Sequence, residues 1–125
     1  MRPISVSIDT QSLKNNLNIV KKFSPNSKIM AVLKANAYGH GLIECARNLN
    51  PIDGIAVLNL SEAIDLREHG FEQKILLLEG FFDKSEIGIA ARMEIDSVVH
   101  CYEQIEMINQ AKLKKPLNLH LKFNT

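Results

Sequence analysis

The chain carries, at residues 32–41, the sequence VLKANAYGHG, in which a lysine directly follows the end of an apolar run. Residues 29–33 are continuously apolar, which is typical of a short strand covered on both faces of a parallel sheet. Lys34 is therefore expected at the carboxyl end of that strand, where α/β sheets collect their ligands. An ammonium held there loses hydration, which favours the neutral amine that attacks a carbonyl group.

The loop expected after Lys34 is suited to a bound phosphate. Gly39 and Gly41 let the backbone come close to a bound group, and Tyr38 can offer its hydroxyl to a phosphate. The segment also fits a simpler description, because lysines at strand ends are commonly solvated and Gly-His-Gly is common in loops. The pattern alone leaves both interpretations open.

Outward from this segment, short apolar strands alternate with amphipathic helices along the whole chain. This alternation predicts an α/β fold with a parallel sheet and right-handed crossovers. An open doubly wound sheet and the N-terminal part of a (β/α)8 barrel both fit, and roughly four to five βα units are present of the eight that a barrel needs. The expected strands are 4–8, 29–33, 54–58, 75–78, 95–99 and 117–123. The expected helices run from caps at Asp9 or Thr10 to Pro25, from Gly41 to Leu49, from caps at Asn59 or Ser61 to Gly70, from a capping box at Asp83 to Ala91, and from Tyr102 to Ala111.

The last expected strand, residues 117–123, alternates strictly between apolar and polar side chains. Asn118, His120 and Lys122 share one face, and the apolar residues share the other. A polar face lining a cavity, with the apolar face under helices, would suit a barrel that holds a ligand. A half-exposed edge strand explains the same alternation equally well.

Composition narrows the classes of function. The chain has 125 residues, 46% of them hydrophobic, so a single domain over residues 1–125 is expected. Its 15 basic and 14 acidic residues give a net charge of +1, which predicts neither nucleic acid nor membrane as a partner. Cys45 and Cys101 form no C-x-x-C pair, so no metal site and no disulfide framework are indicated. No signal peptide or membrane-spanning run is visible, and a cytoplasmic protein is expected.

Residues 34–41, KANAYGHG, closely resemble the pyridoxal-phosphate lysine motif of alanine racemases. The runs SEAIDLREHG at 61–70 and ILLLEG at 75–80 are similar to further patterns of that family, as is LHLKFNT at 119–125. The resemblance covers essentially the whole chain, but only the N-terminal part of an alanine racemase. It implies a partial (β/α)8 barrel, with the family's C-terminal β domain absent from this chain.

The resemblance also implies a function and site residues. The implied function is the pyridoxal-phosphate-dependent racemisation of L-alanine and D-alanine, which supplies D-alanine for cell-wall peptidoglycan. The full-length protein is expected to be a homodimer. Lys34 would bind the cofactor as a Schiff base and act as one of two catalytic bases, and Tyr38 would contact the cofactor phosphate. Lys122 matches a lysine that is often carbamylated. In the family the second base is a tyrosine from the C-terminal domain of the partner subunit. That tyrosine has no counterpart in this chain, so the chain alone is expected to be inactive.

Two alternatives remain at this point. One is a non-catalytic module that binds pyridoxal phosphate or another protein through the same barrel fold, since the chain keeps the lysine but not the second base. The other is an amino acid racemase of broad specificity.

Overall fold

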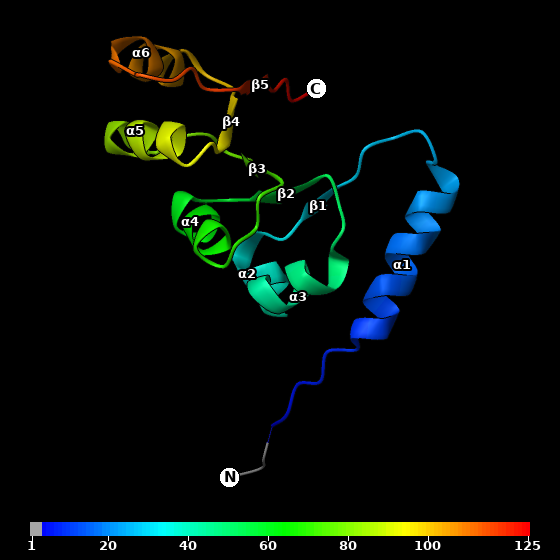
Figure 1. The fold of residues 1–125 in the computed structure, drawn as a ribbon. Helices are drawn as coiled ribbons and strands as arrows, with labels where there is room; N and C mark the ends of the chain where they lie inside the picture. Colours follow the sequence, from blue (N-terminus) through cyan, green and yellow to red (C-terminus); the bar gives the residue numbers. More distant parts are fainter. Residues whose placement is uncertain (1–3) are drawn as a thin grey trace.

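The five strands form one parallel sheet in which every strand lies beside the one that precedes it in the chain. A computed structural model describes residues 4–125 (Figure 1). The strands are β1 (Met30–Val32), β2 (Gly54–Val57), β3 (Lys74–Leu77), β4 (Asp96–Val99) and β5 (Leu119–Leu121), in the sheet order β1-β2-β3-β4-β5. A doubly wound sheet reverses its strand order at a switch point, whereas a barrel adds strands in one direction. The order found here is that of the N-terminal part of a (β/α)8 barrel, which resolves the choice that the pattern left open.

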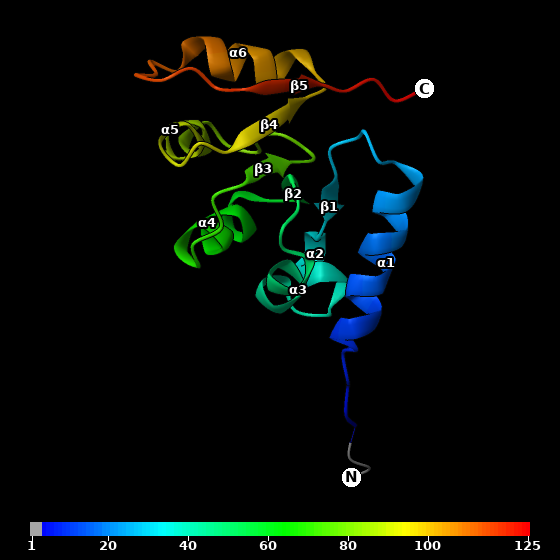
Figure 2. The same cartoon turned by 45° about the vertical axis from the view of Figure 1, so that its right-hand side comes forward.

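Apart from α2, which lies where a loop was predicted, the helices form where the sequence predicts them. They are α1 (Thr10–Phe23), α2 (Lys34–Tyr38), α3 (Leu42–Leu49), α4 (Leu60–Glu68), α5 (Lys84–Arg92) and α6 (Tyr102–Gln110). Asp9 caps α1 by accepting from two backbone N–H groups, Asn59 caps α4, and Asp83 forms the predicted capping box with Glu86. Helix α1 packs beside α3, and α4, α5 and α6 lie along one side of the sheet (Figure 1, Figure 2).

The two faces of the sheet carry different side chains, because successive residues of a strand point to opposite sides. Ile55, Val57, Ile75 and Leu77 are fully buried and pack into the main core with the helices. Burying each of these side chains stabilises the fold by about 2 kcal/mol. The opposite face, which corresponds to a barrel interior, has a smaller cluster of Ala56, Leu76 and Val98.

The prediction of a first strand at residues 4–8 is wrong. These residues are not assigned to a strand, and Ile4 and Val6 are 93% and 78% exposed. A strand needs a neighbour for its backbone N–H and C=O groups, and within residues 4–125 this segment pairs with none of the five strands.

Strand β5 is an edge of the sheet within the described residues. Its outward side chains Leu119 and Leu121 are 46% and 69% exposed, so no helix covers them here. The polar face turns inward, with Asn118 and His120 both bonded to Asp96 of β4. The polar face of this strand therefore lies on the inside of the sheet, as expected for a barrel, and its apolar face is exposed, as expected for an edge strand. Among residues 4–125 no helix combines the length and the apolar character needed to cross a bilayer.

Candidate functional site

The carboxyl ends of the strands bring the predicted site residues to one end of the sheet. Lys34 lies two residues beyond Val32, the last residue of β1, and Lys122 lies directly after β5. Lys34 is half-buried, and its amine makes no hydrogen bond or ion pair within residues 4–125. A lysine amine at this end of a parallel sheet without a carboxylate partner is available for covalent chemistry with a carbonyl compound.

The segment after Lys34 is a left-handed helical turn rather than the glycine-punctuated loop that the sequence predicted. Ala35, Asn36, Ala37 and Tyr38 have φ angles of 53° to 55°, and Gly39 follows with φ 86°. Hydrogen bonds close the turn, from the Ala37 N–H to the Leu33 carbonyl (2.8 Å) and from the Gly39 N–H to the Ala35 carbonyl (3.0 Å). The left-handed conformation costs about 1–2 kcal/mol for each non-glycine residue. Strain of this kind concentrates at functional sites.

Tyr38 ends the left-handed turn with its side chain 61% exposed, so its hydroxyl is accessible to a ligand. His40 lies beside it. Its Nδ1 lies 2.9 Å from the Ala37 carbonyl oxygen, so the imidazole braces the turn. The Tyr38 hydroxyl is therefore the predicted contact for an anion that the turn presents without an internal bond among residues 4–125.

Lys122 belongs to a separate cluster at the same end of the sheet. Its Nζ lies 3.2 Å from Glu79 Oε1, and it also donates to the Leu78 carbonyl oxygen at 3.5 Å. Gln104, which is buried, and His100 both bond the Glu79 carbonyl oxygen, at 2.7 and 3.1 Å. Since β2, β3 and β4 lie between β1 and β5, this cluster is about 19 Å from Lys34 along the sheet, at about 4.8 Å per strand. The structure therefore brings Lys34 and Tyr38 together on one turn and keeps Lys122 apart from them.

A second polar cluster lies at the opposite, amino-terminal end of the sheet and is centred on the buried Asp96. Lys74 Nζ is 3.0 Å and His120 Nε2 is 3.2 Å from Asp96 Oδ2, and Asn118 donates to Oδ1 at 3.2 Å. Burial raises the pKa of the Asp96 carboxyl, but the hydrogen bonds from Lys74, His120 and Asn118 outweigh it and hold that pKa below its ordinary value. His120 thus contacts Asp96 and not Lys122 among the described residues.

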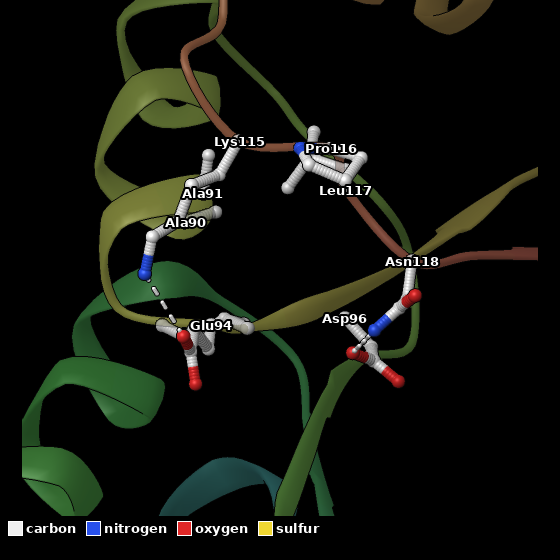
Figure 3. A pocket seen from close by; sticks show the side chains of 9 residues that line it. Ala90, Ala91, Glu94, Asp96, Lys115, Pro116, Leu117 and Asn118 are labelled. Carbon is white, nitrogen blue, oxygen red and sulfur yellow. Dashed lines mark hydrogen bonds and ion pairs between the residues drawn. The ribbon is translucent and has the colours of Figure 1, made fainter.

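Next to this cluster, a pocket of about 310 Å³ lies between α5 and the segment that leads into β5. Figure 3 shows Asn118 pointing at Asp96 within it, and Lys115 pointing at Glu94. The pocket is far from the strand ends that carry Lys34 and Lys122, and its polar groups are already paired with one another. We assign it a structural role.

Sequence reasoning missed Glu62, Glu79 and Asp96. Glu62 follows Asn59 at the spacing of a capping box, and that spacing predicts a local bond back to the Asn59 N–H. Its carboxylate instead bonds the N–H groups of Asn36 and Leu58. Glu79 and Asp96 carry no local signal, because the partners of their side chains lie 22 or more residues away in the chain.

Together, the strand order and the lysine at the end of β1 define a protein of the (β/α)8 barrel class with its candidate site residues at the carboxyl ends of the strands. Residues 8–125 match the family described as alanine racemase, N-terminal domain, and the chain belongs to that family.

Individual relatives agree with this assignment. The chain is 47% identical over 124 residues to an alanine racemase of Paraburkholderia phytofirmans, covering 99% of this chain and 35% of that relative. An alanine racemase of Nitrosomonas europaea is also 47% identical, with 34% of its length covered. The crystal structure of the biosynthetic alanine racemase from Pseudomonas aeruginosa superposes with a TM-score of 0.90 at 39% identity, over 95% of this chain and 34% of that one. The chain therefore spans about a third of the length of these relatives.

Proposed function

We propose that the chain forms the cofactor-binding barrel part of a pyridoxal-phosphate-dependent alanine racemase. The full-length protein interconverts L-alanine and D-alanine in the cytoplasm and supplies D-alanine for peptidoglycan. The observation that carries the proposal is Lys34, a lysine amine without a partner among the described residues, at the carboxyl end of β1 in a chain of this family. The relatives named above are alanine racemases, which supports the choice of substrate.

The residues around Lys34 fit pyridoxal phosphate. The cofactor needs a lysine amine for its aldehyde and hydrogen-bond donors for its phosphate. Lys34 supplies an amine with no ion pair inside residues 4–125, and Tyr38 supplies an exposed hydroxyl from the same turn. No acidic side chain bonds to either group among these residues, so both polar groups are free to contact the cofactor.

When bound, the cofactor supplies the electron sink that makes the α-proton of an amino acid removable. The chain's own residues have two tasks. Lys34 holds the cofactor and, once its amine is released, acts as a base for the α-proton on one side of the substrate. Tyr38 fixes the phosphate, so that the reacting atoms stay in register with Lys34.

Racemisation needs a second base on the opposite side of the substrate. The chain contains only two tyrosines, Tyr38 on the Lys34 turn and Tyr102 at the start of α6. Neither is placed to face Lys34 from the other side. From the resemblance to alanine racemases, in which this base is a tyrosine from the C-terminal domain of the partner subunit, we infer that a full-length homodimer supplies it.

We also propose Lys122 as a site of carbamylation. Its position in the family's strand-end segment supports the assignment, and its amine is only partly exposed, at 31% of the side chain. Carbamylation turns the lysine from a cation into an anion, which Glu79 would repel. The ion pair of 3.2 Å between Lys122 and Glu79 therefore belongs to the unmodified lysine and must open for the modification.

Borohydride reduction tests the central assignment. The test uses a full-length racemase that carries this chain as its N-terminal part. This protein is called the full-length form below. Reduction of the cofactor-loaded full-length form, followed by peptide mapping, is expected to leave the label on Lys34. A label on any other lysine would contradict the assignment.

A further inference from the structure

The left-handed turn after Lys34 needs an external support. Four consecutive non-glycine residues with φ near +54° are together unfavourable by several kcal/mol, at about 1–2 kcal/mol each. Such a backbone persists only where surrounding contacts determine it. Local hydrogen bonds close the turn, among them those from the Ala37 N–H to the Leu33 carbonyl and from the Gly39 N–H to the Ala35 carbonyl. Contacts with other elements add further support.

Glu62, in the first turn of α4, supplies one of these contacts. One oxygen of its carboxylate accepts from the Asn36 N–H at 2.9 Å, and the other accepts from the Leu58 N–H at 3.1 Å. The carboxylate thus joins the turn after β1 to the residue after β2. Bonds from N–H groups to a charged carboxylate are about twice as strong as neutral ones.

Asn36 supplies the other contact. Its side-chain oxygen accepts from the Leu42 N–H at 2.8 Å, where α3 begins. Its carbonyl oxygen accepts from the Gly41 N–H at 3.0 Å. Asn36 is therefore fixed from two directions, by α3 through its side chain and by Glu62 through its backbone, and it lies two residues after Lys34.

An ordinary capping role does not account for Glu62. A glutamate at the third position of a helix normally bonds the N–H of the N-cap residue, which here is Asn59. Glu62 bonds the N–H groups of Leu58 and Asn36 instead. It therefore acts on the backbone that carries Lys34, in addition to any effect on its own helix.

We propose that Glu62 is a positioning residue for Lys34. Its carboxylate holds the left-handed turn, and the turn sets where the Lys34 amine emerges from the end of β1. The proposal rests on the proposed function of Lys34, and it assigns no contact between Glu62 and substrate. A shift of about 1 Å in a reacting group costs up to about 10²-fold in rate, so a modest loosening of the turn is measurable.

The test compares Glu62→Gln with the unmodified full-length form. Glutamine keeps the size of the side chain but offers only one acceptor oxygen and no charge, so one of the two bonds is lost. Three quantities are measured: kcat per bound pyridoxal phosphate, KM for alanine, and the pH midpoint of the visible absorbance of the lysine-bound cofactor. Glu68→Gln is the matched control, because Glu68 is an exposed carboxylate of the same helix with no bond inside residues 4–125.

We expect Glu62→Gln to lower kcat per bound cofactor by roughly tenfold or more and to shift the pH midpoint, with a smaller change in KM. Glu68→Gln should leave all three unchanged. If Glu62→Gln keeps both its kcat per bound cofactor and its pH midpoint, the proposal is wrong, whatever happens to Tm. If Glu62→Gln does not fold, Glu62→Asp, which keeps the charge but has a shorter reach, is judged by the same readouts. Failure of the proposed function is seen separately, as the absence of a borohydride label on Lys34 in the unmodified protein.

Discussion

At the scale of single residues, replacing Lys34 has the most direct effect on the proposed activity. Lys34→Ala removes both the cofactor anchor and one base, so kcat/KM of the full-length form should fall by roughly 10³-fold or more. Lys34→Arg keeps the cation but cannot form the covalent link, and it should lose the borohydride label as well. The measurement is the rate of D-alanine formation from L-alanine. Substantial activity in either variant would contradict the double role of Lys34.

Asp96 gives a prediction about stability and pH. Its folded-state pKa is lowered, so its contacts stabilise the fold at pH values above the unfolded-state pKa of about 3.9. This contribution is lost as the pH falls through the lowered folded-state pKa. Asp96→Asn should therefore destabilise the full-length form by about 2 kcal/mol near neutral pH, because Lys74 and His120 lose a buried partner.

Urea-unfolding midpoints measured over a pH series check this prediction. The difference between Asp96→Asn and the unmodified protein should shrink as the pH falls below about 4. Glu106→Gln, at an exposed position of α6, serves as the control and should show no such difference. If the difference in unfolding midpoint stays constant through the acid range, the charge of Asp96 does not contribute to stability.

At the scale of elements, the left-handed turn predicts a reversal of the usual effect of glycine. Ala35 is exposed and has φ 53°, so Ala35→Gly removes about 1–2 kcal/mol of strain against roughly 0.5–1 kcal/mol of added chain entropy. The net effect should be a stabilisation of about 0.5–1 kcal/mol. Lys14→Gly, at an exposed position of the right-handed helix α1, should instead destabilise by about 0.7 kcal/mol.

Thermal or urea unfolding of the two variants gives the comparison. Opposite signs for Ala35→Gly and Lys14→Gly are the expected result. Destabilisation by Ala35→Gly would show that the turn is less strained than its φ angles imply. The same variant also bears on activity, because a more flexible turn should position Lys34 less well, so a gain in stability and a loss in kcat are expected together.

At the scale of the whole molecule, the isolated 125-residue chain should not racemise alanine at a useful rate. Its second tyrosine, Tyr102, begins α6 after β4, which is three strands away from β1, and so it does not lie opposite Lys34. Without that base, protons are exchanged on one side of the substrate only. D-alanine formation by the purified chain, measured against the full-length form, tests this, and comparable rates would overturn it.

The isolated chain should also self-associate or fold poorly. Strands β1 and β5 are the two edges of the described sheet. Leu121, at the end of β5, and Phe123, just after it, are 69% and 79% exposed. Unpaired backbone groups next to exposed apolar side chains find partners readily. Sedimentation velocity at tens of micromolar, on the order of concentrations where such edges associate, is the measurement. Leu121→Lys with Phe123→Lys should shift the chain toward monomer, whereas a monodisperse, cooperatively folded unmodified chain would contradict the prediction.

Much of the fold was predictable from the sequence alone. The alternation of apolar strands with capped helices predicted the parallel α/β class. The caps found at Asp9, Asn59 and Asp83 are among the positions that the sequence offered. Periodicity and capping depend on residues within one or two helical turns, and such signals can be read locally. The position of Lys34 at the end of β1 was predicted for the same reason.

The tertiary structure decided what depends on distant parts of the chain. The strand order selected the barrel over the doubly wound sheet, and residues 4–8 pair with no strand of that sheet despite their apolar pattern. The left-handed turn is opposed by the local preference of Ala35 and Ala37, and Glu62 supports it from a position 26 residues beyond Asn36. That contact exists because β1 and β2 pair in parallel and bring their carboxyl ends together. The sequence by itself therefore determined where the lysine lies, and tertiary packing decided how its backbone is held, because the energy that offsets the local strain comes from another element.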